Sequence, residues 1–258
     1  MKSASSVLMI LFSAVLLCAC AENPARAGGS VTFDHSAWDQ IVQTYVDENG
    51  KVAYRDLAAK DLPKLERYLQ QIAEANPAAM SEKEALAFTI NAYNALAVKA
   101  VLEGSTAESL IARAKFFKFK TFTVGGKRVT LDELEQKIIR PTFKDPRVHF
   151  ALVCASASCP KLVRRAYTAE NIDAMLDERG REFLADRSRN PLGTGPAVTV
   201  SSIFKWYAED FDAAAGSVQV FIARYAGHYA PPCLMSNTCK LEYAEYDWTL
   251  NAQPGQRP

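Results

Sequence analysis

The sequence predicts an α+β fold in one globular domain, built around a buried central helix. Three observations point to this class. The stretch between Ser81 and Gly104 is apolar on nearly every face of a helix. Short β-type segments fall mostly in the later half of the chain, and no linker or internal repeat interrupts residues 31–251. We therefore expect surrounding helices to pack with the central one on a small, mainly antiparallel sheet, followed by a C-terminal tail at 252–258.

The N-terminus has the pattern of an export signal. Lys2 precedes an apolar run over residues 7–18, which is shorter than the roughly 17 residues that a membrane-spanning helix needs. The sequence Leu-Cys-Ala-Cys ending at Cys20 is similar to the lipobox of bacterial lipoproteins. It predicts a signal peptide over 1–19, a lipid on Cys20 and a tether over 20–30. Cleavage after residue 27, in Ala-Arg-Ala-Gly, is the alternative.

Export places the protein in the cell envelope. The first alternative predicts an outer-membrane lipoprotein facing the periplasm, and the second a soluble periplasmic or secreted protein. The formal net charge is +1, and no block of lysine and arginine stands out. We therefore expect no nucleic-acid partner, and contact with the membrane only through the lipid anchor.

The early part of the chain is predicted to be helical. A stripe of leucine and isoleucine predicts a surface helix over 62–75, and a capping box at Ser81 and Glu84 begins the central helix, which Gly104 ends. Two adjacent glycines indicate a hairpin over 122–129. A second capping box, at Thr130 and Glu133, then predicts a short helix through Ile139.

The later part alternates between expected strands and helices. The apolar run 148–154 is typical of a buried strand, and 168–187 of a helix with one apolar face. A short strand at 198–200, a helix over 218–229 and a closing strand around 241–248 complete the expected elements.

Four cysteines lie beyond the leader, and three pairings of them are possible. Cys233 and Cys239 share a short polar loop, which predicts that they are bonded to each other. Cys154 and Cys159 flank a turn of small residues. They either close that turn as a disulfide or leave Cys154 as a free thiol.

A free Cys154 would have the surroundings of a nucleophile. His149 lies on the preceding run and could act as its base, while Glu135 on the short helix could orient the imidazole. In a regular strand, His149 and Cys154 would point to opposite faces, so the strand must break between them. A zinc site is disfavoured because the Cys-x4-Cys spacing is loose and only three histidines exist, and we expect no metal or other cofactor.

Two further groups of polar residues are candidates for the site. Asn91 and Asn94 share one face of the central helix and either fasten neighbouring loops or line a pocket. The segment 202–211 mixes aromatic and charged residues, of which Lys205 and Asp210 could do more than pack.

Five ordered motifs resemble the domain of unknown function 547 family over most of the chain after residue 31. They are Phe88–Ala95, Leu131–Arg140, His149–Cys154, Ile203–Phe211 and Tyr246–Asn251. The resemblance implies a single envelope-associated domain with a site like that of a cysteine hydrolase. It also implies that the first cysteine of the pair matters more than the second, which favours a working thiol at Cys154. The family pattern picks out Asn91, Asn94, Glu135, Arg140, His149, Cys154, Asp210, Asp247 and Trp248.

Two functions remain open on this evidence. The first is a thiol-dependent hydrolase or acyl transferase that acts on a peptide, amide or ester. Its catalytic residues would be Cys154, His149 and Glu135, with Asn91, Asn94, Arg140 and Asp210 binding or orienting the substrate. The second is a non-catalytic module that binds a small molecule, peptide or protein and holds its cysteines as disulfides.

Overall fold

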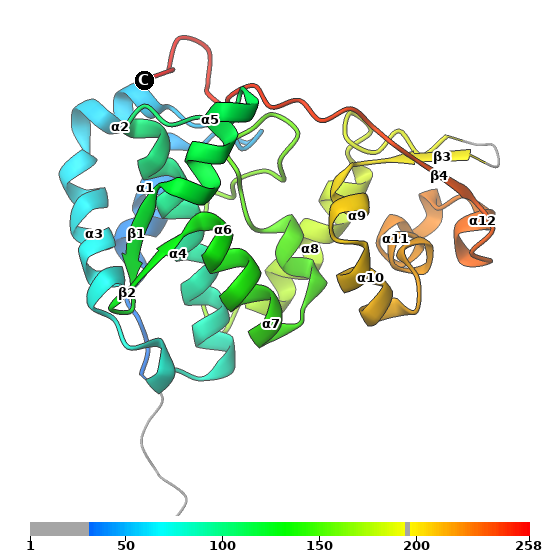
Figure 1. Cartoon of the computed structure of the whole chain (residues 1–258), viewed down its shortest axis with the longest axis horizontal. Helices are drawn as coiled ribbons and strands as arrows, with labels where there is room; N and C mark the ends of the chain where they lie inside the picture. Colours follow the sequence, from blue (N-terminus) through cyan, green and yellow to red (C-terminus); the bar gives the residue numbers. More distant parts are fainter. Residues whose placement is uncertain (1–30, 194–196) are drawn as a thin grey trace, which may run out of the picture.

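The computed structural model describes residues 31–193 and 197–258 and has the predicted α+β class. Figure 1 shows a larger lobe at the N-terminal side of the sequence and a smaller lobe that holds the later elements. The first elements are α1 (Ser36–Tyr45), α2 (Tyr54–Lys60), α3 (Leu62–Glu74), the 3-10 turn η1 (Pro77–Ala79) and α4 (Glu82–Leu102).

The large lobe continues with a second set of short elements around the hairpin. These are α5 (Leu110–Ala114), the π-helical turn η2 (Lys115–Phe119), β1 (Thr121–Val124), β2 (Lys127–Thr130), α6 (Leu131–Glu133), the π-helical turn η3 (Leu134–Ile139), α7 (Arg140–Phe143) and the 3-10 turn η4 (Pro146–Phe150). The small lobe follows α8 (Ile172–Ala185). It contains β3 (Ala197–Val200), α9 (Ile203–Trp206), α10 (Ala208–Ala215), α11 (Val218–Ala226), the 3-10 turn η5 (Gly227–Tyr229), α12 (Pro232–Met235) and β4 (Lys240–Tyr243).

Helix α4 is the buried centre that the sequence predicts. The Ser81 hydroxyl accepts the backbone N–H of Glu84 at its start, and Gly104 follows its end with a φ of +78°. Among the described residues, α4 is the one helix long and apolar enough to cross a bilayer by length and composition, but 83% of that window is buried inside the protein. Its apolar character is therefore accounted for by the core.

Two hydrophobic clusters divide the interior. One surrounds α4 and includes α1, α3 and the hairpin, whereas the other joins the small-lobe helices α9 to α12 to Phe150. Helix α8 contributes Met175 to the first cluster and Phe183 to the second. It therefore packs on both lobes.

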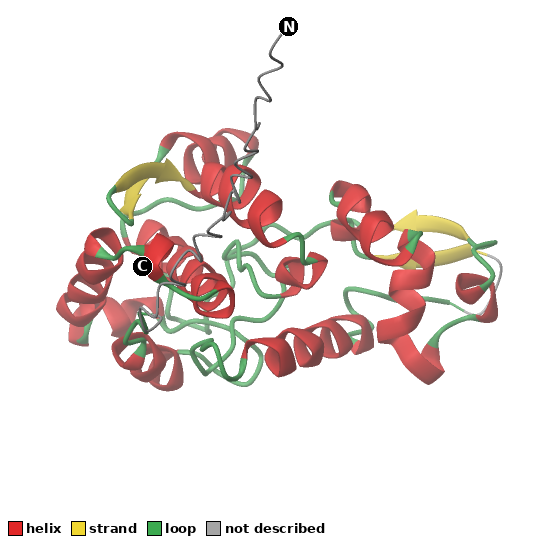
Figure 2. Ribbon diagram, turned by 90° about the horizontal axis from the view of Figure 1, so that it is seen from below, coloured by secondary structure: helices red, strands yellow, loops and turns green. Residues whose placement is uncertain are grey.

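The expected single, mainly antiparallel sheet is wrong. The structure instead has two separate two-stranded sheets, antiparallel β1–β2 and parallel β3–β4, and Figure 2 shows the two pairs at opposite ends of the molecule. The hairpin forms as predicted, with Thr121 opposite Thr130. Strands β3 and β4 can pair in parallel because the helices α9 to α12 return the chain between them.

The strand expected over 148–154 is also wrong, since this run forms η4 and then an irregular turn. The Asp145 side chain accepts the backbone N–H of Arg147, and Pro146 occupies the first position of the turn, where its missing N–H costs nothing. The run is buried on every side, so apolar periodicity could not distinguish a strand from a helical turn.

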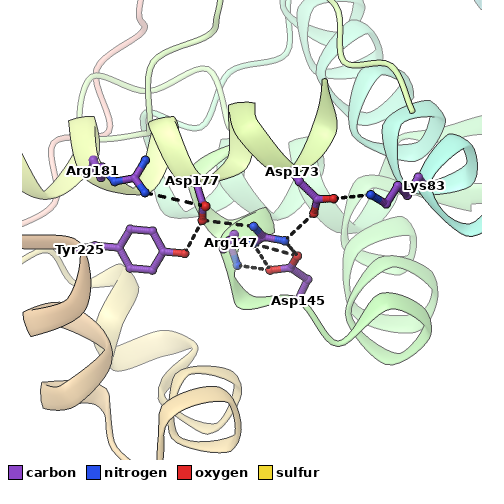
Figure 3. A network of polar contacts seen from close by, with 7 residues as sticks. All are labelled: Lys83, Asp145, Arg147, Asp173, Asp177, Arg181 and Tyr225. Atoms are coloured by element: carbon purple, nitrogen blue, oxygen red, sulfur yellow. Dashed lines mark hydrogen bonds and ion pairs between the residues drawn. The ribbon is translucent and has the colours of Figure 1, made fainter. Parts of the chain in front are cut away.

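Turn η4 is fixed to the helices around it by a network of charges (Figure 3). The Arg147 guanidinium lies 2.6 Å from Asp145, 3.0 Å from Asp173 and 3.2 Å from Asp177. Tyr225 of α11 donates to Asp177 at 2.8 Å, and Lys83 of α4 pairs with Asp173 at 2.6 Å. The network thereby joins α4, η4, α8 and α11.

The residues after β4 cross the molecule from the small lobe to the large one, as Figure 1 shows. Residues 246–248 are not a strand, in contrast to the expected closing strand, which is confined to β4. The predicted tail is anchored to the large lobe. Gln256 accepts the backbone N–H of Arg55 at 3.1 Å, and Arg257 pairs with Glu108 at 2.7 Å.

Candidate functional site

His149 stands on η4, on the side that faces the later helices. Its Nε2 lies 2.7 Å from Asp210 Oδ2, and its ring stacks on that of Tyr207 with 3.7 Å between ring centroids. The side chain is buried, and Phe211 meets the ring edge-on. Two side chains from the small lobe thus hold the imidazole in one orientation.

Arg140 completes this arrangement from α7. Its guanidinium makes a two-pronged contact with the Asp210 carboxylate, at 2.7 Å and 2.9 Å, and also donates to Gln136. Partial burial alone would raise the pKa of Asp210, but the hydrogen bonds from His149 and Arg140 outweigh it and hold that pKa well below its usual value. Asp210 is therefore an anion at neutral pH, fixed between two donors.

The expectation that Glu135 orients His149 is not supported by this geometry. The carboxylate bonded to the imidazole belongs to Asp210. Glu135 is buried on η3, where the Tyr93 hydroxyl donates to it at 3.3 Å and the Tyr207 hydroxyl also bonds to it. Burial raises the pKa of Glu135, against the opposing effects of Tyr207, His149 and Tyr93. The sequence did not indicate that Asp210 is the partner of His149, because the two residues lie far apart along the chain.

Cys154 and Cys159 form a disulfide that closes the turn of small residues. Of the two alternatives left open by the sequence, the structure shows the bridge and not the free thiol. The sulfur of Cys154 lies 3.0 Å from Ser156 Oγ and 3.4 Å from the hydroxyl of Tyr246. The predicted bridge between Cys233 and Cys239 is confirmed.

These groups surround one cavity of about 400 Å³ at the junction of the lobes. His149 and Cys154 both line it, and because η4 and the turn replace the expected strand, the objection that they point to opposite faces does not apply. The cavity is lined by Tyr93, Leu110, Arg113, Ala114, Phe117, Lys118, Asp132, Glu135, Gln136, His149, Leu152, Cys154, Cys159, Pro160, Ile203, Trp206, Tyr207, Tyr246 and Trp248.

Aromatic side chains from two distant segments form one wall of this cavity. Trp206 of α9 packs against Tyr246 and Trp248, with ring centroids 4.8 Å and 5.8 Å away. The Arg113 guanidinium lies 3.6 Å above the Trp248 ring, a cation–π contact that joins α5 to these rings. Partial burial lowers the pKa of Arg113 from its usual value. The wall therefore forms only when the residues after β4 cross back over the large lobe.

Asn91 and Asn94 fasten loops and do not line this cavity. Asn91 exchanges two hydrogen bonds with the backbone of Tyr167, at 2.7 Å and 3.1 Å. Asn94 donates to the Ala151 carbonyl and accepts the Val153 N–H, each at 2.9 Å. Because each amide bonds to backbone through both its oxygen and its nitrogen, its part in the site is indirect: Asn94 holds the segment that leads to Cys154.

Several residues of the site were missed by sequence reasoning. Tyr93 and Tyr207 lie within the motifs Phe88–Ala95 and Ile203–Phe211, whereas Arg113 lies outside all five motifs. The available signal for Tyr93 was its position between Asn91 and Asn94 on the central helix. Lys205 does not reach the cavity and lies 5.7 Å from the Tyr243 ring. Within residues 31–193 and 197–258, no group of three or more histidine, cysteine, aspartate or glutamate side chains is placed to hold a metal ion. The predicted lipidation site, Cys20, lies outside the described residues.

Comparison with known proteins gives one match. Residues 77–184 match the family model described as protein of unknown function, DUF547. The matched region runs from η1 through most of α8. It contains Glu135, Arg140, His149 and Cys154, and leaves out Asp210 and the aromatic wall. It covers less than half of the chain and supports the assignment to that family. No curated protein and no solved structure matches the chain significantly.

Proposed function

We propose, on the premise that residues 77–184 represent a domain of the DUF547 family, that this protein binds a small organic molecule without transforming it. The cavity of about 400 Å³ at the lobe junction is the observation that carries the proposal. A cavity of this size is in the range of small-molecule sites, which are mainly apolar and contain a few convergent polar groups. We infer a ligand with an aromatic or apolar body and one uncharged polar end.

The aromatic wall supports the apolar body of the ligand. Tyr246 and Trp248 present ring faces and edges at 4.5 Å from each other, and Phe117 and Leu152 face the same space. Such rings bind flat apolar groups by burying large areas and by offset stacking. Because Trp206 is about half exposed, an incoming ligand would cover it and remove its apolar surface from water.

The polar end is supported by Glu135 and its tyrosines. Burial raises the pKa of Glu135, and its carboxyl oxygens can accept a hydrogen bond from a ligand. The stacked pair of Tyr207 and His149 holds this corner in place, and Asp210 and Arg140 lock the imidazole from behind. An amide or hydroxyl group, which can donate a hydrogen bond to a carboxyl oxygen, therefore suits this end of the cavity.

The disulfide supports binding over catalysis. A bonded Cys154 has no thiolate, and the thiolate is the nucleophile in cysteine chemistry. As a bridge, Cys154 and Cys159 hold the turn that forms one wall, so that the cavity is shaped before the ligand arrives. Such preorganisation lowers the entropic cost of binding.

The site of action that we propose is the cell envelope, with a lipid on Cys20. Two disulfides within one chain are typical of oxidising compartments and support export. Metabolic labelling with palmitate should mark the parent protein and leave Cys20→Ala unlabelled. A parent protein that carries no label and begins at Gly28 would instead favour the soluble alternative.

Replacing each of two alanines of α5 with tryptophan, in separate variants, tests ligand binding. Ala114 lines the cavity, whereas Ala112, two residues earlier on the same helix, does not and is also half-buried. The probe is N-phenyl-1-naphthylamine, an uncharged aromatic amine that fluoresces in apolar sites. We expect Ala114→Trp to fill the cavity and raise the Kd of the probe at least about tenfold, and Ala112→Trp to leave it within about twofold. Equal affinities in both variants, with circular dichroism showing intact folds, would overturn the proposal.

A second candidate function is favoured by one observation, that Cys154 and His149 line the same cavity. A dithiol that reduces the Cys154–Cys159 disulfide, and is itself oxidised to a disulfide, would free the Cys154 thiol. This thiol would then line the same cavity as His149, a base already fixed by Asp210. This gives a thiol hydrolase or acyl transferase that works only when reduced. Cys159→Ser releases Cys154 without a reductant. If the candidate is right, iodoacetamide should alkylate Cys154 at pH 7 faster than it alkylates glutathione. Adding His149→Gln should slow the reaction about tenfold, and a rate unaffected by His149 argues against it.

A further inference from the structure

The segment of α5 and η2, residues 110–119, contains three exposed large hydrophobic side chains. We call it the α5–η2 arm. Leu110, Ile111 and Phe119 expose 78%, 73% and 72% of their surface, the three largest values among the large hydrophobic residues described. Large exposed apolar groups gathered on one element mark interaction sites, whereas scattered single ones do not.

Cations stand among these apolar side chains. Lys115 and Lys118 are exposed on the arm, and within residues 31–193 and 197–258 neither has an ion-pair partner. By contrast Lys120, just beyond the arm, pairs with Glu103 at 2.5 Å. The arm also contains Arg113 and no acidic residue, so its exposed face is both apolar and positively charged.

The arm is held firmly in this position. Phe116 is fully buried in the main core, and its ring packs edge-on against that of Phe117 with 4.9 Å between centroids. The Ser109 hydroxyl caps α5 by accepting the N–H of Ala112. The exposed leucine, isoleucine and phenylalanine therefore belong to an anchored helix and are not the result of a frayed end.

We infer that the α5–η2 arm docks on an anionic lipid surface. Apolar side chains mixed with lysine on one helical face are the composition of segments that lie in the membrane interface, where lysine stems cover apolar surface and ammonium groups meet the headgroups. The free charges of Lys115 and Lys118 match a surface of phosphate-bearing lipids. The inference depends on the arm alone and stands whether or not the cavity binds a ligand.

Docking in this manner would turn the cavity toward the membrane. Leu110 and Lys118 belong both to the arm and to the cavity lining, and Trp206, which also lines the cavity, is 46% exposed. The mouth would then open at the headgroup level, and Trp206 would lie near the interface. Tryptophan is enriched at this depth in membrane proteins.

Quenching of Trp206 fluorescence by doxyl-labelled lipid tests the inference. The full chain is added to vesicles of phosphatidylcholine, alone or with about 30% phosphatidylglycerol, and Trp206→Phe identifies the signal of Trp206. We expect quenching on the anionic vesicles, and its loss in 0.5 M NaCl, because salt screens the lysines. Removing the two charges with Lys115→Gln and Lys118→Gln should weaken the vesicle affinity that the arm contributes about thirtyfold.

Matched variants keep the test specific. Ile111→Ser with Phe119→Ser removes apolar groups from the arm, and Met235→Ser removes one that is 65% exposed in the small lobe. Lys51→Gln with Lys127→Gln removes two exposed charges elsewhere. All variants retain the N-terminal residues, so any binding by these is common to all. Quenching that survives both arm pairs, or that is the same without anionic lipid, overturns the inference. The inference is also overturned if the parent shows no quenching by lipid but sediments as a dimer, and the arm variants abolish that dimer.

Discussion

Turn η4 separates two regions that use the same kinds of charged residue for different ends. On one side, Arg147 is surrounded by Asp145, Asp173 and Asp177, and the network joins η4 to α4, α8 and α11 (Figure 3). On the other side, His149 is bonded to Asp210 and lines the cavity. The residues Arg147 and His149 are two apart and share one 3-10 turn, so sequence position alone does not tell the structural network from the site.

The difference lies in what each network leaves available. The three carboxylates around Arg147 engage all three nitrogens of its guanidinium, and the hydrogen bond to Asp145 is the main reason that its pKa is raised. In the second region the same type of ion pair, between Arg140 and Asp210, fixes an imidazole whose ring faces a space large enough for a ligand. A charged network is therefore evidence of function only when it adjoins a cavity.

The largest expected effect comes from removing the centre of the first network. Arg147→Met leaves three carboxylates close together without their cation, and should lower the free energy of unfolding by about 3 kcal/mol, discounted because Asp173 is half exposed. Urea unfolding measures this change. Arg181→Met is the control, since Arg181 is exposed and lies 3.9 Å from Asp177, and it should change stability by less than about 0.5 kcal/mol.

The same variant sharpens the comparison if ligand binding is measured too. Arg147→Met should leave the Kd of N-phenyl-1-naphthylamine within about twofold while the protein is folded. A loss of probe affinity as large as that caused by Ala114→Trp would mean that the two regions are not separate.

A second buried histidine provides the next test. His35 is as buried as His149 but bonds to the Tyr68 hydroxyl at 2.7 Å instead of to a carboxylate. Burial lowers the pKa of His35 to about 4. The unfolded chain, with the ordinary value near 6.5, binds the proton more readily, so stability is full above pH 6.5 and is lost as the pH falls toward 4.

We expect His35 to account for roughly 2 kcal/mol of the stability lost between pH 7 and pH 4.5. His35→Gln should therefore unfold with a flatter pH dependence than the parent, as measured by urea titrations at both pH values. The exposed His228→Gln should follow the parent. If His35→Gln follows it as well, the pKa of His35 is not lowered as described.

The smallest expected change in stability comes from the second network. Asp210→Asn removes the ion pair with Arg140 and weakens the bond to His149, and should cost about 1 kcal/mol because Asp210 is partly exposed. Its effect on the cavity should be larger than its effect on the fold. The probe should bind about fivefold more weakly, whereas Asp177→Asn, in the first network, should leave binding unchanged. If Asp177→Asn weakened probe binding more than Asp210→Asn did, the ligand site would not lie on the His149 side of η4.

Much of the fold could be predicted because its signals are local. The cap at Ser81, the capping box at Thr130, the paired glycines of the hairpin and the apolar face of α3 each specify an element over a few residues. The Cys233–Cys239 bridge was predictable for the same reason, as a short polar loop holds both cysteines. By contrast the run 148–154 is buried on every side, so its apolar residues show no periodicity that distinguishes a strand from a helical turn.

The net charge of the chain also hid a local property. A balance of +1 excluded a strongly basic protein, yet three cations and no acid fall within the ten residues of the α5–η2 arm. Apolar residues separate these cations, so no block of lysine and arginine is visible. Only the exposure of Lys115 and Lys118, together with that of Ile111 and Phe119, sets the arm apart.

The sequence by itself determined the α+β class, the three longest helices (α3, α4 and α8), and the choice of His149, Arg140, Asp210 and Cys154 as candidate site residues. Tertiary structure decided which of them meet. Asp210 and not Glu135 bonds to His149, Cys154 is bridged, and Tyr246 and Trp248 return to form the cavity wall. The physical reason is that local signals act over one or two turns, whereas the cavity is assembled from segments as far apart as residues 93 and 248, which only packing of the two lobes brings together.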